Sequence, residues 1–363
     1  MDMEKIKLIA YYLPQYHPIS ENDNFWGKGF TEWTNVTKAR PLFRGHKQPK
    51  LPADLGFYDL RVPESRIAQA ELAKSYGISG FSYWHYWFGN DKQVLNRPLQ
   101  EVHKSGQPDF PFCIAWANQS WTGRWHGLDD KVIIEQLYLG RQDDERHFYS
   151  ILPYLKDKRY ISYRGKLLII IYKPLAHPYL DEFTKHWRSL ALENGLGELY
   201  FLGLTYENGI IPSGLDGAIL QDAYFTHEGN ASLDRISKKV TGKKLRDYYN
   251  IITKGVKAYT YSSVVEKSNN HDIVGNIFPT ILTGWDNTPR SGRNGYVFTR
   301  YSPELFRKHL IKVRGQLARN HTGETLCFIK SWNEWAEGNY LEPDQEYGHK
   351  FLEVLREVFP KNG

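Results

Sequence analysis

Two glutamates near the C-terminus have the residue type and surroundings that acid–base chemistry requires. Glu334 and Glu337 stand in the segment 331–338 (SWNEWAEG), directly after an apolar run at 325–329. A glycosidase uses one carboxyl with a raised pKa as proton donor and a second carboxylate as base or nucleophile. The two indoles of this segment can desolvate a carboxyl and can stack on the apolar faces of sugar rings. We therefore predict that Glu334 and Glu337 are catalytic residues acting on carbohydrate.

The spacing of the two glutamates sets a geometric condition. Residues three apart in a regular strand face opposite sides of the sheet. Both carboxyls can face one cavity only if the chain turns between them, and Gly338 permits such a turn. A Glu-x-x-Glu pair by itself is most often structural, so the hypothesis depends on the position of this pair after a strand and between two tryptophans.

Apolar runs alternate with helix-like segments along most of the chain, which is typical of a parallel sheet covered by helices. Several runs are continuously apolar, as expected for strands buried on both faces. Eight strands predict a (β/α)8 TIM barrel, an α/β fold that needs about 250 residues. We interpret residues 1–363 as one such domain with long loops at its C-terminal face. The predicted strands are 6–13, 78–84, 110–117, 166–172, 199–205, 217–221, 277–282 and 325–330.

Six helices are predicted between or after these strands, at 63–76, 97–104, 144–156, 179–193, 303–319 and 350–358. Pro153 should kink the third of them or end it early. Residues 222–276 are expected to hold helices and an insertion after the sixth strand. The segment 14–60 is longer than most loops of compact domains, so it should form a wall or lid over the barrel mouth.

Ten of the 11 tryptophans lie at predicted strand ends or in the segments that follow them, and only Trp187 lies in a helix. One tryptophan in such a place would most simply cap the core. Ten of them at the pole where barrel enzymes build their active sites indicate a binding cleft. Polar neighbours such as His85, Asn118 and Asp286 suit a ligand rich in hydroxyl groups, although an isolated asparagine there is equally well explained as a loop cap.

Composition and motif content argue against several other functional classes. The net charge of +6 is mild and scattered, and the densest basic cluster, at 238–244, is best explained as a solvated helix face, so no nucleic-acid partner is expected. Cys113 and Cys327 lie in apolar runs and should be buried free thiols. No His-x-His or His-Glu-x-x-His spacing occurs, and we expect no metal and no cofactor. Neither a signal peptide nor an apolar run long enough for a membrane span is found, so we expect a cytoplasmic protein.

Six segments together resemble the WbsX family, whose members are described as glycosyltransferases of bacterial surface-polysaccharide loci. The resemblance covers residues 6–357, nearly the whole chain. The WbsX family is similar in turn to glycoside hydrolase family 99, the endo-α-1,2-mannosidases and mannanases, mainly through the last segment. The six segments are 11–17 (YYLPQYH), 30–35 (FTEWTN), 83–87 (YWHYW), 116–121 (WANQSW), 284–290 (GWDNTPR) and 332–338 (WNEWAEG).

The resemblance implies a barrel and a metal-independent mechanism that retains configuration. By that resemblance Glu334 takes the proton of the sugar 2-hydroxyl, which attacks the anomeric carbon to give an anhydro sugar. Glu337 protonates the leaving oxygen and later activates water or an acceptor hydroxyl. The motifs and the aromatic pattern together predict substrate contacts from Tyr12, His17, Glu32, Trp33, Trp84, His85, Trp116, Asn118, Trp121, Trp285, Asp286, Asn333 and Trp335.

Several alternatives stay open. A direct nucleophile could come from Glu32, Glu207, Asp222 or Asp286 instead. A nucleotide-sugar-dependent transferase agrees with the family description, but the chain has neither an Asp-x-Asp motif nor a Gly-x-Gly-x-x-Gly loop. A non-catalytic sugar-binding barrel would keep the tryptophans without needing paired acids. The sequence leaves the sugar, the anomer, the linkage, endo or exo action and the oligomeric state unspecified.

Overall fold

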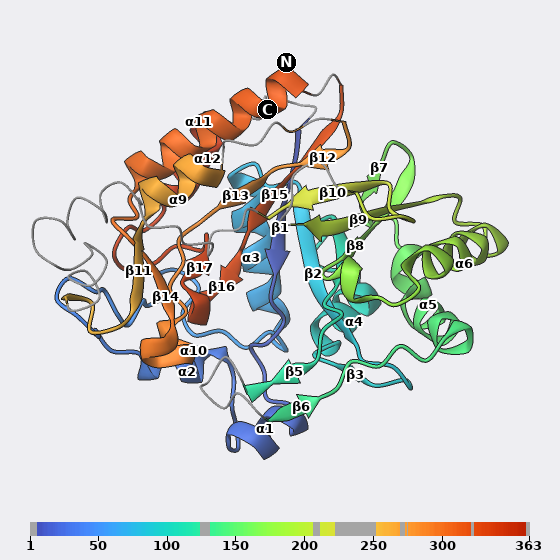
Figure 1. Ribbon diagram of the computed structural model, residues 1–363, viewed down its shortest axis with the longest axis horizontal. Helices are drawn as coiled ribbons and strands as arrows, with labels where there is room; N and C mark the ends of the chain where they lie inside the picture. The colour runs from blue at the N-terminus through green and yellow to red at the C-terminus, as the bar shows by residue number, and fades with distance from the viewer. Residues whose placement is uncertain are drawn as a thin grey trace, which may run out of the picture.

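A curled sheet of nine parallel strands forms the centre of the molecule (Figure 1). The computed structural model describes residues 6–123, 131–205, 211–221, 252–268, 273, 275–320 and 323–360. Along the sheet the strands follow the order β12-β10-β9-β8-β4-β2-β1-β15-β13. Their bounds are β1 (Ile6–Tyr12), β2 (Gly80–Trp87), β4 (Phe112–Trp116), β8 (Lys166–Ile171), β9 (Leu199–Thr205), β10 (Gly217–Leu220), β12 (Ile277–Phe278), β13 (Thr280–Leu282) and β15 (Thr325–Lys330).

The two ends of this sheet are consecutive pieces of one predicted strand. β12 pairs with β10, and β13, which follows directly after Pro279, pairs with β15. Proline has no backbone N–H to donate to a neighbouring strand, so Pro279 interrupts the strand while the chain continues in the same direction. The Pro279 carbonyl still accepts a hydrogen bond of 3.0 Å from the Phe328 N–H. The sheet therefore curls into a nearly closed barrel, and the eight predicted strands and the TIM-barrel fold class are confirmed.

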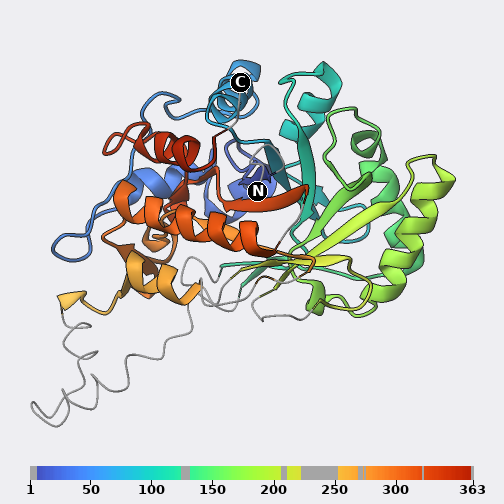
Figure 2. The same cartoon turned by 90° about the horizontal axis from the view of Figure 1, so that it is seen from above.

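Helices cover the outside of the barrel (Figures 1 and 2). α3, α4, α5 and α6 follow the first half of the sheet, and α11 packs against α12 beside β13. All six predicted helices are present, with ends that differ from the prediction by at most three residues. Their bounds are α3 (Pro63–Ser75), α4 (Arg97–Ser105), α5 (Arg141–Leu155), α6 (Leu180–Glu193), α11 (Pro303–Asn320) and α12 (Lys350–Val358).

The sequence predicts that Pro153 kinks the third helix or ends it early. Pro153 neither ends α5 nor shortens it by much, because the helix continues to Leu155. A proline in a helix interior removes one hydrogen bond and crowds the preceding turn. Here it lies in the last turn, and the residue four positions earlier, Tyr149, is exposed, so water can serve the carbonyl that lost its partner.

Strand burial explains why both faces of the sheet are apolar. Every residue of β2 and β4 is buried, since helices cover one face and the barrel interior the other. Gly80 allows β2 to approach its neighbours, because a Cβ there would lie 2.6 Å from the Pro111 carbonyl oxygen. Cys113 and Cys327 are buried free thiols within this core, as predicted.

Short elements gather at the carboxyl ends of the strands, at the lower edge of Figure 1. The segment 14–60 contributes two helices there, and its far end is fixed by a hydrogen bond of 3.0 Å from Ala53 N–H to the Pro343 carbonyl. These elements are α1 (Ser20–Trp26), α2 (Glu32–Lys38), α10 (Thr288–Ser291), the 3-10 turns η4 (Gly292–Asn294) and η5 (Trp335–Glu337), the hairpin β5 (Trp121–Thr122) with β6 (Val132–Ile134), and the hairpin β16 (Asn333–Glu334) with β17 (Asn339–Tyr340).

The remaining elements are peripheral. β3 (Gln93–Val94) and β7 (Ser162–Tyr163) pair antiparallel with β2 and β8, and η3 (Pro174–Ala176) follows β8. In the region predicted as an insertion, β11 (Lys257–Thr260) pairs with β14 (Tyr296–Thr299) and α9 (Tyr261–Ser268) follows it. Trp125, Glu207, Asp222 and the basic cluster at 238–244 lie outside the described residues. Within the described parts of the chain, no helix is both long and apolar enough to cross a membrane.

Candidate active site

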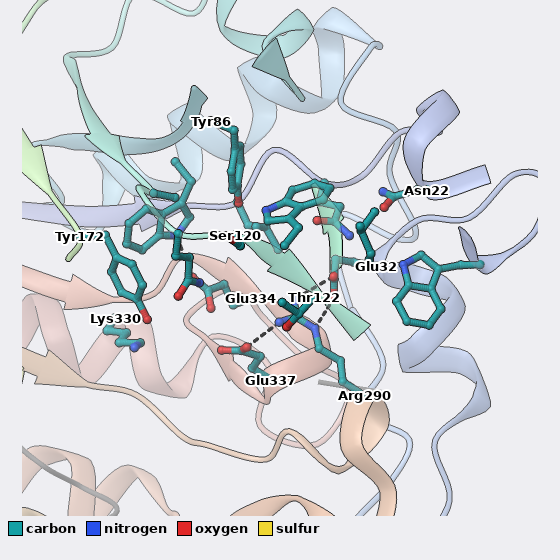
Figure 3. A pocket seen from close by; sticks show the side chains of 18 of the residues that line it. Asn22, Glu32, Tyr86, Ser120, Thr122, Tyr172, Arg290, Lys330, Glu334 and Glu337 are labelled. Atoms are coloured by element: carbon teal, nitrogen blue, oxygen red, sulfur yellow. Dashed lines mark hydrogen bonds and ion pairs between the residues drawn. The ribbon is translucent and has the colours of Figure 1, made fainter. Parts of the chain in front are cut away.

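A cavity of about 180 Å³ opens at the carboxyl ends of the barrel strands, where the sequence predicts the active site. Figure 3 shows that its walls combine aromatic rings with three glutamates and two cationic side chains. The residues that line it are Leu13, Gln15, Asn22, Trp26, Glu32, Trp84, Tyr86, Ala117, Gln119, Ser120, Trp121, Thr122, Ile133, Tyr172, Trp285, Arg290, Lys330, Glu334 and Glu337.

The chain turns between Glu334 and Glu337, so both carboxyls reach this cavity. Glu334 ends the short strand β16, and the 3-10 turn η5 then carries Glu337 round to the same side. Gly338 closes the turn in the left-handed region with a φ of 56°. The two side chains lie close enough for Glu337 to raise the pKa of Glu334. The chain thus makes the turn that two glutamates three residues apart need if both carboxyls are to face one cavity.

Glu334 lies in surroundings that favour its neutral form. Its Oε1 accepts a hydrogen bond of 2.9 Å from the indole N–H of Trp84. Burial raises the pKa of Glu334, and the nearby charge of Glu337 raises it further, while Lys330 and Arg290 lower it. The net effect raises the pKa to about 8, so the last proton of this carboxyl pair is lost only as pH rises through that value.

Glu337 has a different neighbour, the guanidinium of Arg290. Nη1 of Arg290 lies 2.5 Å from Oε1 of Glu337, and Nη2 lies 2.8 Å from Oε1 of Glu32 (Figure 3). Burial alone would lower the pKa of Arg290, but the charges of Glu32 and Glu337 raise it above its usual value. Arg290 therefore stays charged. Burial raises the pKa of Glu32, and the charge of Arg290 counteracts part of that effect.

Aromatic rings form much of the cavity wall. The ring of Trp84 stacks on Tyr11 at 4.9 Å, which fixes the indole that contacts Glu334. The Lys330 ammonium lies 5.0 Å from the centre of the Trp285 ring, and Lys330 and Tyr172 lie on the opposite side of the cavity from Arg290 (Figure 3). Flat apolar faces beside carboxyl groups suit the alternating apolar and hydroxylated surfaces of a sugar.

The structure brings six of the fifteen predicted site residues to this cavity: Glu32, Trp84, Trp121, Trp285, Glu334 and Glu337. It places the other nine elsewhere: Tyr12, His17, Trp33, His85, Trp116, Asn118, Asp286, Asn333 and Trp335. All nine are buried, and their assignment as substrate contacts stays a prediction.

Strand alternation explains the position of His85 and Trp116. Successive side chains of β2 point to opposite faces, so Trp84 and Tyr86 face the cavity while His85 faces the helices. The His85 ring stacks on His147 of α5, with 3.0 Å between their Nε2 atoms. Trp116 lies in the same outer layer, 4.8 Å from the His147 ring, and donates its indole N–H to the Trp87 carbonyl at 3.0 Å.

Three of the other predicted residues hold backbone segments together beneath the cavity. Asn333 accepts from the Leu13 N–H at 2.7 Å and donates to the Leu13 carbonyl at 3.1 Å, which fastens β16 to the end of β1. Asn118 accepts from the Lys173 N–H at 2.7 Å and donates to its carbonyl at 2.8 Å. Asp286 accepts from His46 and Gln48, both at 2.7 Å.

The last four lie in the aromatic layer under the pair or at its rim. Tyr12 donates to Gln69 at 2.6 Å, and Trp33 donates to the Tyr58 carbonyl at 2.8 Å. Trp335 donates its indole N–H to Glu342 at 2.6 Å. His17 is buried, and this burial lowers its pKa. These contacts support the loops that carry Glu32, Glu334 and Glu337.

Sequence reasoning missed two cationic residues of the cavity, Arg290 and Lys330. Lys330 is the last residue of β15, and a lysine that ends an apolar run at the catalytic pole is a signal that could have been used. Arg290 belongs to the segment 284–290, but nothing in the sequence indicated that α10 would bring it to Glu337, 47 residues further along. Tyr86 could have been found from its spacing of two residues from Trp84. Among the described residues, no group of three or more His, Cys, Asp and Glu is arranged to hold a metal ion.

Comparison with known proteins identifies the family of the chain. The sequence matches the family described as "Glycosyltransferase WbsX" over residues 8–355. The chain belongs to the WbsX family. Two relatives, both named "Uncharacterized protein WxcX" and both from Xanthomonas campestris pv. campestris (strains ATCC 33913 and B100), are 34% identical over 361 residues, covering 98% of this chain and 50% of each relative. The chain therefore spans about half the length of these curated relatives.

Solved structures share the barrel at low sequence identity. A "Glycoside hydrolase-like protein" superposes with a TM-score of 0.59 at 14% identity, covering 99% of this chain and 95% of the other. The GH99 endo-alpha-mannosidase from Bacteroides thetaiotaomicron, solved in complex with bis-tris propane, gives 0.53 at 16% identity, with 99% and 96% covered. These likenesses concern the fold, and the chain is a member of a carbohydrate-active family built on a glycosidase-like barrel.

Proposed function

We propose that this protein makes or breaks glycosidic bonds in a bacterial cell-surface polysaccharide such as an O-antigen, a lipopolysaccharide or a capsule. The observation that carries the proposal is the cavity in which Glu334, whose pKa burial raises, lies near Glu337, which is ion-paired with Arg290. Two carboxyls in different surroundings at a barrel mouth are the groups that glycosidic chemistry needs. Family membership supports a saccharide substrate.

We propose a retaining mechanism in two steps, following the division of work that the resemblance implies. In the first, Glu334 removes the proton of the sugar 2-hydroxyl, whose oxygen bonds to the anomeric carbon. The bond from that carbon to the leaving oxygen breaks, its electron pair stays on the oxygen, and Glu337 protonates it. In the second, Glu337 takes a proton from water or an acceptor hydroxyl, which attacks the anomeric carbon, and Glu334 returns a proton to the 2-oxygen. Water gives hydrolysis and a sugar hydroxyl gives transglycosylation.

A nucleotide-sugar-dependent transferase of lipopolysaccharide biosynthesis is the second candidate, and the family description favours it. A non-catalytic glycan-binding barrel is the third, but it would have no need for a buried carboxyl pair. For all three we propose a cytoplasmic location, an oligo- or polysaccharide ligand and no cofactor.

The test is incubation of the pure protein with a panel of bacterial O-antigen and α-mannan oligosaccharides, without metal or nucleotide sugar, followed by mass spectrometry. Hydrolysis or transfer that disappears in Glu337→Gln and Glu334→Gln, while both variants still bind the glycan, is the expected result. Turnover only after nucleotide sugars are added would overturn the hydrolytic proposal in favour of the transferase. Binding without turnover in either condition would favour the glycan-binding barrel.

A further inference from the structure

We propose that Lys330 is a specificity-determining residue that selects an acidic sugar, one with a carboxylate or phosphate substituent, at one side of the catalytic cavity. This inference rests on the proposed function, because it takes the cavity to be the place where a glycan binds. It goes further than that function, because it assigns the charge of the sugar residue that binds beside Lys330. It can be measured by binding alone, without turnover.

The end of strand β15 fixes the position of Lys330. Lys330 is the last residue of this strand, and its carbonyl accepts hydrogen bonds from the N–H of Thr283 at 3.1 Å and from the Thr283 hydroxyl at 2.7 Å. Phe328 lies two residues earlier, so its side chain leaves the same face of the strand. The Phe328 ring stacks at 5.9 Å on Tyr11, the residue that also carries the Trp84 ring of the cavity wall. The Lys330 side chain therefore lines the cavity from below.

The Lys330 ammonium lies over the face of an aromatic ring. Its Nζ is 5.0 Å from the centre of the Trp285 ring. Within the part of the chain that the structure describes, this ammonium donates no hydrogen bond and joins no ion pair. An ammonium has three N–H donors, and a cation–π contact attracts the charge without accepting those hydrogens at an oxygen. Because Lys330 is only partly buried, its donors are available to a ligand in the cavity.

Arg290 and Lys330 lie at opposite sides of the cavity and differ in their partners (Figure 3). Arg290 lies 2.8 Å from a carboxyl oxygen of Glu32 and 2.5 Å from one of Glu337. Of the carboxyl groups among the described residues, none forms an ion pair with Lys330. An anionic group on a ligand would be repelled by glutamates beside Arg290 and attracted by the ammonium of Lys330. A negative charge on the sugar is therefore favoured only at the Lys330 side.

Glu334 does not neutralise Lys330 by direct contact. Its carboxyl accepts the Trp84 N–H at 2.9 Å, and Lys330 acts on it only through space, as a charge that lowers its pKa. A neutral sugar bound in the cavity would remove water from the ammonium without supplying an opposite charge, which is costly. A carboxylate or phosphate on the sugar supplies that charge, and hydrogen bonds between charged partners are stronger than those between neutral ones.

Aromatic rings at the same side can hold the sugar ring while its substituent reaches Lys330. The rings of Trp84 and Tyr172 meet edge to face at 5.4 Å, and both line the cavity together with Trp285. A second ammonium, that of the exposed Lys173, lies 5.8 Å from the centre of the Tyr172 ring. Two cations beside aromatic faces give this side of the mouth a positive potential that favours the approach of an acidic glycan.

The first experiment compares charged glycans with neutral partners of the same configuration by isothermal titration calorimetry. The probes are uronate-containing oligosaccharides of bacterial polysaccharides before and after carboxyl reduction, and phosphorylated mannan oligosaccharides before and after phosphatase treatment. We expect the wild-type protein to bind the charged member of at least one pair roughly tenfold more tightly, because the neutral member lacks the charged contact with Lys330. The two kinds of pair distinguish a carboxylate from a phosphate. Equal binding of both members in every pair, or no binding of any charged member, would overturn the proposal.

The second experiment repeats these titrations with variants of Lys330. Lys330→Met should weaken binding of the charged member roughly tenfold and that of the neutral member less than about twofold, since only the charged member uses the ammonium. Lys330→Arg keeps the positive charge and should keep the preference. Lys312→Met is the matched control, because it removes one positive charge from the exposed side of α11, outside the cavity, and should change neither affinity.

Equal losses for the charged and neutral members in Lys330→Met would show that Lys330 serves packing or the charge of Glu334, which contradicts a role in selecting the sugar. A charge preference that survives in Lys330→Met would also overturn the assignment. If Lys330→Met does not fold, the wild-type pairs and Lys330→Arg still decide the question. Charge-selective binding without turnover would support this inference while contradicting the proposed catalytic function, and turnover of neutral glycans alone would do the reverse.

Discussion

At the scale of single residues, the two carboxyls of the site are distinguished by the atoms they touch. Glu334 receives one N–H from Trp84, and Glu337 receives the guanidinium of Arg290. The same side-chain type thus has different surroundings in the two positions, because desolvation favours the neutral form of Glu334 and a guanidinium contacts Glu337. The mechanism that we propose uses this difference.

The pH dependence of the wild-type enzyme should report this arrangement. The pKa of Glu334 is raised to about 8, so the last proton of the pair is lost as pH rises through that value. We expect kcat/KM for the substrate found in the glycan panel to fall tenfold per pH unit above about 8, whichever glutamate donates, since titration belongs to the pair. Activity that stays level up to pH 10 would contradict a catalytic role for this proton.

Trp84 should affect catalysis more than binding. Trp84→Phe keeps an aromatic ring on Tyr11 but removes the N–H that contacts Glu334. A hydrogen bond to an ionisable group contributes about 1.5–3 kcal/mol, so we expect kcat to fall roughly tenfold or more while KM changes little. Trp121→Phe is the matched comparison, because Trp121 lines the cavity but has no hydrogen bond to either catalytic glutamate, and its effect should appear in KM. The opposite pattern would assign Trp84 to substrate stacking alone.

Many of the cavity residues could be predicted from the sequence, but the ion pairs of Arg290 with Glu32 and Glu337 could not. The glutamate pair and the tryptophans were predictable because they cluster in short motifs after apolar runs. The separation of Trp84 from His85 follows from strand alternation. Arg290 and its contact with Glu32 depend on how three loops meet in space, and no periodicity in the sequence encodes that meeting.

At the scale of elements, one turn orients the pair. The hairpin of β16 with β17 holds η5 between its strands, and Gly338 follows Glu337 in the left-handed region. A Cβ at Gly338 would lie 2.7 Å from Cβ and 2.8 Å from the backbone N of Asp286. The turn therefore packs directly on the start of the segment that leads to Arg290.

Gly338→Ala should displace Glu337 from its partner. The left-handed conformation costs an L-residue roughly 1–2 kcal/mol, and the contact with Asp286 adds to that cost. We expect at least a tenfold loss of kcat/KM together with lower thermal stability. Gly348→Ala is the matched control, because Gly348 has a similar φ of 53° and a Cβ added there would meet nothing within 4 Å. If the two alanine variants behave alike, backbone strain alone is responsible and close packing on Asp286 is unimportant.

The elements themselves were largely predictable. Continuous apolar runs identified every barrel strand, and helix periodicity identified the six covering helices. The loops at the mouth were harder, because the short elements α1, α2, α10 and η5 have only three to seven residues, and α2, α10 and η5 contact one another across long sequence separations. Pro279 lies within a correctly predicted strand. The sequence did not predict that the residues before it, β12, would pair with β10 and the residues after it, β13, with β15.

At the scale of the whole molecule, the site reduces stability at alkaline pH. The folded-state pKa of Glu334, about 8, is raised above its ordinary value of 4.5, so the folded protein binds this proton more tightly than the unfolded chain does. The stabilising contribution is complete below about pH 4.5 and is lost as pH rises through about 8. Glu342, whose pKa burial raises to about 7, acts in the same direction.

Replacing Glu334 with glutamine should therefore stabilise the protein more at high pH than at low pH. One pKa unit corresponds to about 1.4 kcal/mol, so we expect the free energy of unfolding of Glu334→Gln, relative to wild type, to rise by at least that much between pH 5 and pH 9. Chemical denaturation at both pH values measures it, with Glu353→Gln on the exposed face of α12 as the control. A difference that is independent of pH would show that the proton on Glu334 is not linked to folding.

The pairing of β1 with β15 has a consequence for synthesis on the ribosome. The first barrel strand pairs with β2 early, but its second permanent neighbour, β15, emerges much later, and Asn333 then fastens to Leu13 across 320 residues. At typical elongation rates that interval lasts about 15 to 65 seconds. Both glutamates emerge after β15, so the nascent chain has neither a closed barrel nor its acid pair during that time. The activity proposed for this barrel can therefore appear only after the segment 325–338 has been translated.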